Sequence, residues 1–183
     1  MSDMFLERNF DPPLNTEGVI GMAIDAAGCF GLHGIDWHRS LLSSDGRKLV
    51  CWFSGPDLES ARIALRQINA DMRRLWRGTI HNAPGLEEHE LGSANVLVTR
   101  SFEDPVELQD IQAMEDAGAW CLETRDVRFI RTYFSADRKR MVCLYEAPDA
   151  ESVRQAQREA GVPFDDAWSV VPVGPEDIIP VSQ

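Results

Sequence analysis

Short stretches of alternating apolar and polar residues are separated by longer stretches in which apolar residues recur at a helical spacing. In the first half of the chain the alternation predicts strands over Met4–Phe10, Ile35–Ser43, Leu49–Ser54 and Arg74–His81. The helical spacing predicts helices over Asn15–His33 and from Pro56 to Asn69. Asp57 stands at the start of the second helix, where its carboxylate is a favourable N-cap. The predicted order is therefore β-α-β-β-α-β.

The same order returns in the second half of the chain. Strands are predicted over Val96–Phe102, Val127–Ser135, Met141–Glu146 and Ala167–Val173, and helices over Glu107–Arg125 and Pro148–Gly161. When the sequence is shifted by the separation of Cys51 from Cys143, residues 4–81 fall on residues 96–173 without a gap. Identical pairs spread over the whole length: Arg8/Arg100, Phe10/Phe102, Met22/Met114, Cys29/Cys121, Arg39/Arg131, Asp45/Asp137 and Trp76/Trp168. We interpret the chain as an internal duplication.

Each half has the element order of a ferredoxin-like α+β domain, in which helices cover one face of an antiparallel sheet. We predict one such repeat over residues 1–81 and a second over residues 95–173. Residues 82–94 are polar and contain Gly and Pro, which predicts a linker, and residues 174–183 are predicted to form a tail.

The predicted strands are apolar on both faces. Leu49, Cys51 and Phe53 share one face of the third strand, and Val50 and Trp52 share the other. Alternation along the second strand groups Trp37 with Leu41 and, in the second repeat, Phe129 with Tyr133. Because helices cover only one face, the second face needs another cover. We predict that the two sheets pack face to face as a pseudo-dimeric α+β barrel with a cavity between them; the alternative is contact with another chain.

Composition narrows the possible partners and the compartment. The chain of 183 residues has a formal net charge of -12, which disfavours nucleic acid or an anionic membrane as a partner. No apolar run approaches the roughly 20 residues of a membrane span, so we expect a cytoplasmic protein, monomeric or homodimeric. The four cysteines lack a CxxC spacing, which predicts buried thiols rather than a zinc or redox site.

Differences between the two repeats mark candidate catalytic residues. His38 is a strand histidine with no counterpart in the second repeat, and its imidazole is suited to act as general acid or base near neutral pH. Arg39, Arg131 and Tyr133 lie on the same predicted strands and complete the candidate catalytic set. The alternative is that His38 lies on an exposed edge strand.

Two arginine positions, Arg8/Arg100 and Arg39/Arg131, recur on apolar strands of both repeats and suggest ligand binding. A buried guanidinium needs an anion, and for these arginines that anion is a ligand or a protein carboxylate. On the first view, Arg8 and Arg100 bind a carboxylate or phenolate in the cavity, together with Trp37 and Trp52. On the second view, the arginines form ion pairs that hold the sheet.

One stretch of the second repeat resembles a known family. The sequence RMVCLYEAPDAESVRQAQREAGVPFDDAW (Arg140–Trp168), with the strand VRFIRTY before it, resembles the small nickel-binding-protein family of ferredoxin-like domains. The resemblance implies this fold and, in some members, a metal site built with histidines. All four histidines of this chain precede residue 95, and His33 and His38 are the candidate ligands for nickel or another divalent metal.

Together these observations predict a protein that binds a small molecule or a metal at a site between the two repeats. The alternative is a cofactor-free enzyme of the monooxygenase, isomerase or cyclase type, acting on a small hydrophobic or aromatic substrate. That alternative rests on analogy between folds. A third class, a purely structural or interaction module, predicts a barrel that is filled by side chains.

Overall fold

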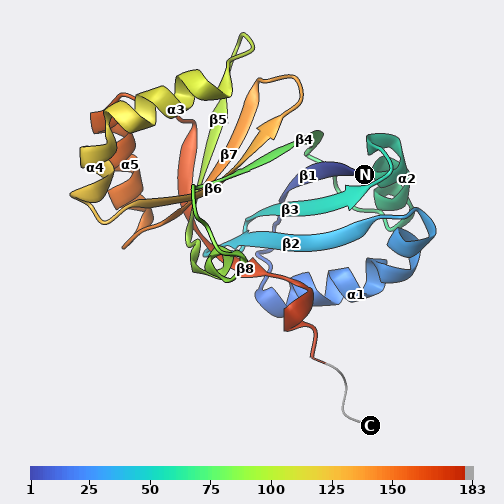
Figure 1. Cartoon of the computed structure of the whole chain (residues 1–183). Coiled ribbons are helices and arrows are strands. Elements are labelled where there is room, and N and C mark those ends of the chain that lie inside the picture. Colours follow the sequence, from blue (N-terminus) through green and yellow to red (C-terminus); the bar gives the residue numbers. More distant parts are fainter. Residues whose placement is uncertain (180–183) are drawn as a thin grey trace. The chain divides into compact units, whose positions relative to one another are not determined.

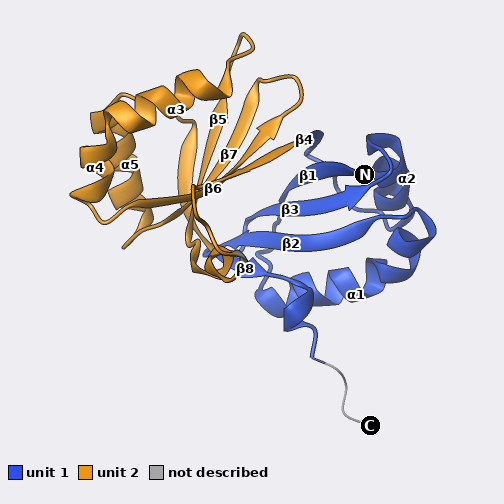
Figure 2. Ribbon diagram, viewed as in Figure 1, with its two compact units in different colours: residues 1–78, 171–183 blue, residues 79–170 orange. Residues whose placement is uncertain are grey.

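The computed structural model describes residues 1–179, which form two compact units (Figure 2). Unit 1 consists of Met1–Gly78 together with the chain from Val171 onward, and unit 2 consists of Thr79–Val170. Within the described part of the chain, no helix is long and apolar enough to cross a membrane.

The elements of unit 1 follow the predicted order β-α-β-β-α-β (Figure 1). They are β1 (Ser2–Asn9), α1 (Thr16–Leu32), β2 (Asp36–Ser43), β3 (Lys48–Gly55), α2 (Leu58–Gln67) and β4 (Arg74–Asn82). The end of β4, from Thr79, belongs to unit 2. The strands pair antiparallel in the order β4-β1-β3-β2, with β4 joined to β1 through Arg74–Gly78. This strand order is ferredoxin-like.

Unit 2 repeats this order (Figure 1). Its elements are η1 (Glu88–Ser93), β5 (Val96–Ser101), α3 (Leu108–Ala117), α4 (Ala119–Glu123), β6 (Arg128–Ser135), β7 (Arg140–Glu146), α5 (Ala150–Ala160) and β8 (Asp166–Val173). The end of β8, from Val171, belongs to unit 1. The strands pair antiparallel in the order β8-β5-β7-β6. The α+β class and the ferredoxin-like order of both repeats are confirmed. The packing of one sheet against the other stays a prediction.

The ends of the helices follow the local sequence. Asp57 accepts a hydrogen bond from the Ser60 amide at 2.8 Å, so it is the N-cap of α2, as predicted. Asn69 and Gly161 have positive φ values and end the second helix of each unit. Both residue types tolerate this left-handed conformation at low cost, which is why they stop the helices here.

One predicted helix is interrupted in the structure, so the prediction of a single continuous helix is wrong. The sequence predicted a single helix over Glu107–Arg125, but the structure has α3 and α4, which meet at Gly118. A Cβ atom on Gly118 would lie 2.4 Å from the Cβ atom of Ala160 in α5. The close approach of α5 to this point therefore requires glycine, and glycine is a poor residue inside a helix.

A β-bulge in each unit corrects the predicted faces of the second strand. The register of β2 against β3 shifts between Trp37 and Arg39, and that of β6 against β7 shifts between Phe129 and Arg131. An extra residue inverts the alternation beyond it. The predicted groupings of Trp37 with Leu41 and of Phe129 with Tyr133 on one face are therefore wrong.

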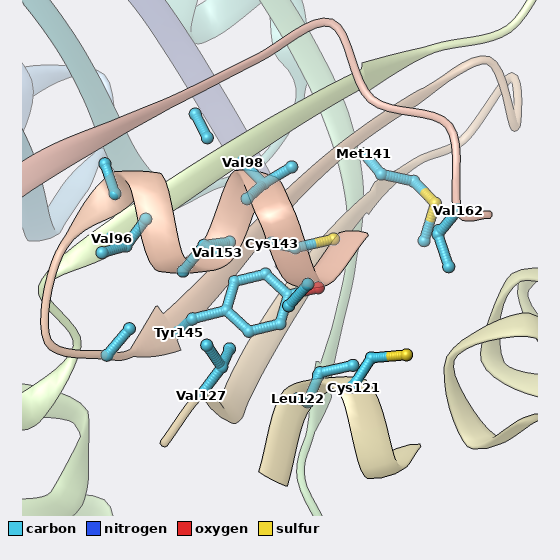
Figure 3. Packing of buried hydrophobic residues seen from close by; sticks show 14 of the residues in the cluster. Val96, Val98, Cys121, Leu122, Val127, Met141, Cys143, Tyr145, Val153 and Val162 are labelled. Carbon is cyan, nitrogen blue, oxygen red and sulfur yellow. The ribbon is translucent and has the colours of Figure 1, made fainter. Parts of the chain in front are cut away.

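The core of each unit lies between its helices and the sheet face that they cover. In unit 1, Leu6 of β1 packs in one cluster with Phe30 of α1 and Ala64 of α2. In unit 2, the ring of Tyr145 lies beside Val153 within the equivalent cluster (Figure 3). The two units therefore have their hydrophobic cores in equivalent places, between the helices and the sheet.

The segments predicted as linker and tail are partly built into the units. In the linker, η1 carries Glu90, which forms an ion pair with Arg128 of β6 at 3.0 Å. The tail begins with η2 (Pro175–Asp177), and Pro175 and Ile178 contact the interior of unit 1. Residues 180–183, the end of the predicted tail, lie outside the described residues.

Candidate ligand-binding site

A half-open cavity of about 330 Å³ lies in unit 1, between α1 and the sheet. The apolar residues of its wall are Leu6, Val19, Met22, Ala23, Ala26, Ala27, Phe30, Gly31, Ile35, Trp37, Leu49, Phe53, Leu65, Ile68, Pro175 and Ile178. The polar or charged residues and the thiol of its wall are Arg8, Asp36, Ser40 and Cys51. An apolar wall with a few polar groups is the usual composition of a small-molecule site.

The sequence of α1 explains why space remains at this place. The positions that α1 contributes to the wall include Ala23, Ala26, Ala27 and Gly31, and none of these side chains is larger than a methyl group. Longer side chains here would fill the gap between the helix and the sheet. The predictions from sequence did not include these residues, although the run of Ala and Gly in residues 16–32 was a usable signal.

Arg8 is the cationic side chain of the wall. Its Nη1 atom lies 3.6 Å from the sulfur of Met22, and its guanidinium carbon lies 4.8 Å from the centre of the Phe10 ring. Its Nε atom is buried and has no hydrogen-bond partner in the described chain. No described carboxylate forms an ion pair with Arg8. Arg8 therefore places in the cavity wall a positive charge with N–H groups that no described acceptor uses.

A short chain of hydrogen bonds runs along the wall beside Arg8. The Trp37 indole N–H donates to the Ser40 hydroxyl at 3.0 Å, and this hydroxyl donates to the Cys51 sulfur at 2.9 Å. Burial raises the pKa of the Cys51 thiol to about 11. The thiol is therefore protonated at neutral pH, and Cys51 is a wall residue rather than a nucleophile.

In unit 2 both terminal nitrogens of the equivalent arginine have acceptors, although its Nε atom, like that of Arg8, is buried without a hydrogen-bond partner among the described residues. Arg100 is 1% exposed and donates from Nη1 to the Pro163 carbonyl at 2.6 Å. From Nη2 it donates to Glu115 at 3.2 Å, to the Tyr145 hydroxyl at 3.1 Å and to the Gln157 side-chain oxygen at 2.8 Å. Burial raises the pKa of Tyr145 well above its ordinary value, and the nearby Glu115 carboxylate adds to this. Arg100 therefore has a structural role that Arg8 lacks.

The comparison with family models concerns unit 2. Residues 97–170 match the family model described as "Nickel responsive protein SCO4226-like". The matched segment is SCO4226-like. It lies entirely within unit 2 and leaves out all of unit 1, including the cavity wall. No curated protein matches the chain.

Solved structures resemble the fold at low sequence identity. SCO4226 from Streptomyces coelicolor A3(2) is 19% identical, with a TM-score of 0.37, over 40% of this chain and 91% of its own. A proposed chlorite dismutase, TA0507, is 11% identical, with a TM-score of 0.53, over 94% of both chains. An anthrone oxidase-like protein is 9% identical, with a TM-score of 0.46, over 100% of this chain and 97% of its own. The likeness to TA0507 shows a shared fold.

The SCO4226-like segment supplies no imidazole for a metal, because residues 97–170 contain no histidine. In unit 1, His33 Nε2 lies 2.9 Å from the Gln67 side-chain oxygen, which also accepts from the Cys29 thiol at 3.0 Å. His38 Nε2 instead lies 2.7 Å from the Ser54 hydroxyl. Among the described residues, no group of three or more His, Cys, Asp or Glu side chains could hold a metal ion. This donor set does not fit a closed nickel site.

Two predicted catalytic residues and one predicted ligand-binding residue lie on the face of the unit 1 sheet opposite the helices. His38, at the bulge, stacks on Trp52 with ring centres 4.4 Å apart. Arg39 forms an ion pair with Glu176 of η2 at 2.7 Å. Of the residues predicted to bind a ligand, Arg8 and Trp37 line the cavity, whereas Trp52 does not.

The other two predicted catalytic residues are buried in unit 2. Arg131 donates from Nε to the Asn82 side-chain oxygen at 2.6 Å, and Tyr133 is 1% exposed. Both follow the bulge on β6, on the sheet face opposite the helices. The catalytic roles of these residues stay predictions.

Proposed function

We propose that this protein binds a small, largely apolar molecule in the cavity of unit 1. The observation that carries the proposal is the cavity itself, whose volume of about 330 Å³ is at the lower end of the range of small-molecule sites. Apolar side chains that line an open cavity lack packing partners on one side and so forfeit dispersion contacts. A bound molecule would restore those contacts.

The chemistry of the wall supports reversible binding rather than catalysis within the cavity. Cys51 is held as a neutral thiol, and the Ser40 hydroxyl donates a hydrogen bond to its sulfur. Neither group is paired with a base that could activate it. The enzyme alternative therefore depends on His38, Arg39, Arg131 and Tyr133, none of which lines this cavity.

Ligand-observed NMR with indole and toluene as neutral probes tests the proposal. We expect both probes to bind the natural protein and to be excluded by Ala26→Phe, because Ala26 is buried in the cavity wall. Ala113→Phe is the matched control, because Ala113 is an exposed residue of α3 in unit 2. Absence of probe binding to the natural protein, or equal binding to Ala26→Phe, would contradict the proposal.

Divalent metal binding is the second candidate, favoured by the family model that matches residues 97–170. Its imidazole ligands would have to come from outside the matched segment, where His33 and Cys29 both contact Gln67. Calorimetric titration of nickel into protein without a histidine tag, compared with His33→Ala, tests this candidate. Stoichiometric heat that the substitution abolishes would favour a metal-binding function over the cavity proposal.

A further inference from the structure

The two units provide an internal comparison of the same arginine in two surroundings. Arg8 of β1 lies opposite Leu49 of β3, and Arg100 of β5 lies opposite Met141 of β7. These pairs are equivalent in the gap-free alignment of the repeats, so Arg8 and Arg100 occupy equivalent backbone positions in the two units. The side chains around the two guanidinium groups can therefore be compared position by position.

The neighbours that hold Arg100 are missing around Arg8. The acceptors of the Arg100 Nη2 group are the side chains of Glu115, Tyr145 and Gln157. The equivalent residues of unit 1 are Ala23, Phe53 and Leu65. All three are apolar, and all three line the cavity. Because of this exchange of residues, Arg8 lacks the carboxylate, the hydroxyl and the amide that surround Arg100.

The same exchange also creates space. Alanine at position 23 is shorter than glutamate by a carboxyl group and a methylene, and this is the side chain that would reach the guanidinium if unit 1 followed unit 2. The cavity thus extends to the place where the Glu115 carboxylate lies in unit 2. An arginine is charged at every accessible pH, and a cation in apolar surroundings is stabilised by an anion brought close to it.

We infer that the ligand of unit 1 is a small monocarboxylic acid with an apolar body, and that Arg8 binds its carboxylate. This inference rests on the proposed function of the cavity. The carboxylate takes the position that Glu115 has in unit 2, and the apolar body lies against Ala26 and Phe30 of α1. Arg8 can donate two hydrogen bonds to one carboxylate, which is the strongest pairing open to it.

The charges of the wall favour a single negative charge over a phosphate. Arg8 is the cation of the described wall, and Asp36 contributes a carboxylate to the same lining. A phosphate carries close to two negative charges at neutral pH. In this wall it would be surrounded by one guanidinium, an acidic residue and apolar surfaces, so part of its charge would stay uncompensated. A carboxylate is neutralised by the one cation present.

Calorimetry with phenylacetic acid and its neutral isostere phenylacetamide tests the inference. We expect the natural protein to prefer the acid by at least tenfold, since charge-assisted hydrogen bonds are the stronger ones. Arg8→Met should weaken acid binding on the order of 100-fold and leave amide binding nearly unchanged. Arg47→Met, which removes an exposed arginine of the same unit, is the matched control and should change neither.

A second variant tests the same inference by adding an ion-pair partner for Arg8. Ala23→Glu places the missing carboxylate of unit 2 beside Arg8, so it should abolish acid binding and raise the melting temperature. Ala23→Gln has the same size without the charge and should raise the melting temperature less. If Ala23→Glu still prefers the acid, or if Arg8→Met keeps the preference, the inference is wrong.

The outcomes also separate the inference from the proposed function. Equal binding of acid and amide by the natural protein overturns the role of Arg8 and leaves the cavity as a binding site for neutral molecules. Binding of neither compound, combined with no binding of indole or toluene, overturns both.

Discussion

Removing the carboxylate partner of Arg100 should destabilise unit 2 strongly. In Glu115→Ala the guanidinium stays buried at 1% exposure and loses the anion that lies 3.2 Å from its Nη2 atom. Breaking a buried ion pair by removing one partner costs about 3–5 kcal/mol. Arg100 keeps the Pro163 carbonyl and the Gln157 side chain as acceptors, so we expect the lower end, about 3 kcal/mol.

Urea unfolding and calorimetry at pH 7 measure this cost. For a chain of this length, about 3 kcal/mol corresponds to a decrease in melting temperature of about 6–12 °C. The control is a double-mutant cycle with Arg100→Met, in which Glu115→Ala should cost less than about 1 kcal/mol because no buried cation is left. Arg8→Met in unit 1 should likewise change stability by less than about 1 kcal/mol, because Arg8 has no ion pair among the described residues.

Two results would refute this reasoning. One is a Glu115→Ala protein whose unfolding free energy equals that of the natural protein, which would mean that neutral acceptors alone satisfy Arg100. The other is a coupling energy near zero in the double-mutant cycle. Either result would also weaken the contrast between Arg100 and Arg8, on which the proposed ligand charge depends.

Two further predictions concern packing and pH. Gly118→Ala should cost about 1–3 kcal/mol in unfolding free energy, because its Cβ would lie 2.4 Å from the Ala160 Cβ. Gly28→Ala, whose Cβ meets nothing within 4 Å, should instead stabilise α1 by about 0.5–1 kcal/mol, and equal effects would contradict the packing argument. Burial raises the pKa of the Cys51 thiol from 9.0 to about 11, so the folded state holds this proton more tightly than the unfolded state. Its contribution of about 3 kcal/mol should be complete below pH 9 and should be lost as the pH rises towards 11. Urea unfolding across this range should show a shallower alkaline loss for Cys51→Val, and an unchanged slope would contradict the assignment.

The sequence by itself determined the order of the main elements and several of their ends. The N-cap at Asp57 and the left-handed stops at Asn69 and Gly161 involve hydrogen bonds and backbone angles within a few residues, so local composition is enough to predict them. Periodicity likewise predicted the strands and helices of both units, and their order indicated the ferredoxin-like fold.

Only the tertiary structure decided which side chains share a site. The bulges at His38 and Ile130 depend on the pairing of β2 with β3 and of β6 with β7, and each moves every later residue of its strand to the opposite face. The cavity depends on side chains that are too short to meet across the space between helix and sheet. The sequence named Arg8 and Arg100 as equals, because both occupy the same place on the same strand. Residues distant in the chain make one of them a part of the core and leave the other facing a cavity, since burial and charge pairing are properties of the packed neighbours.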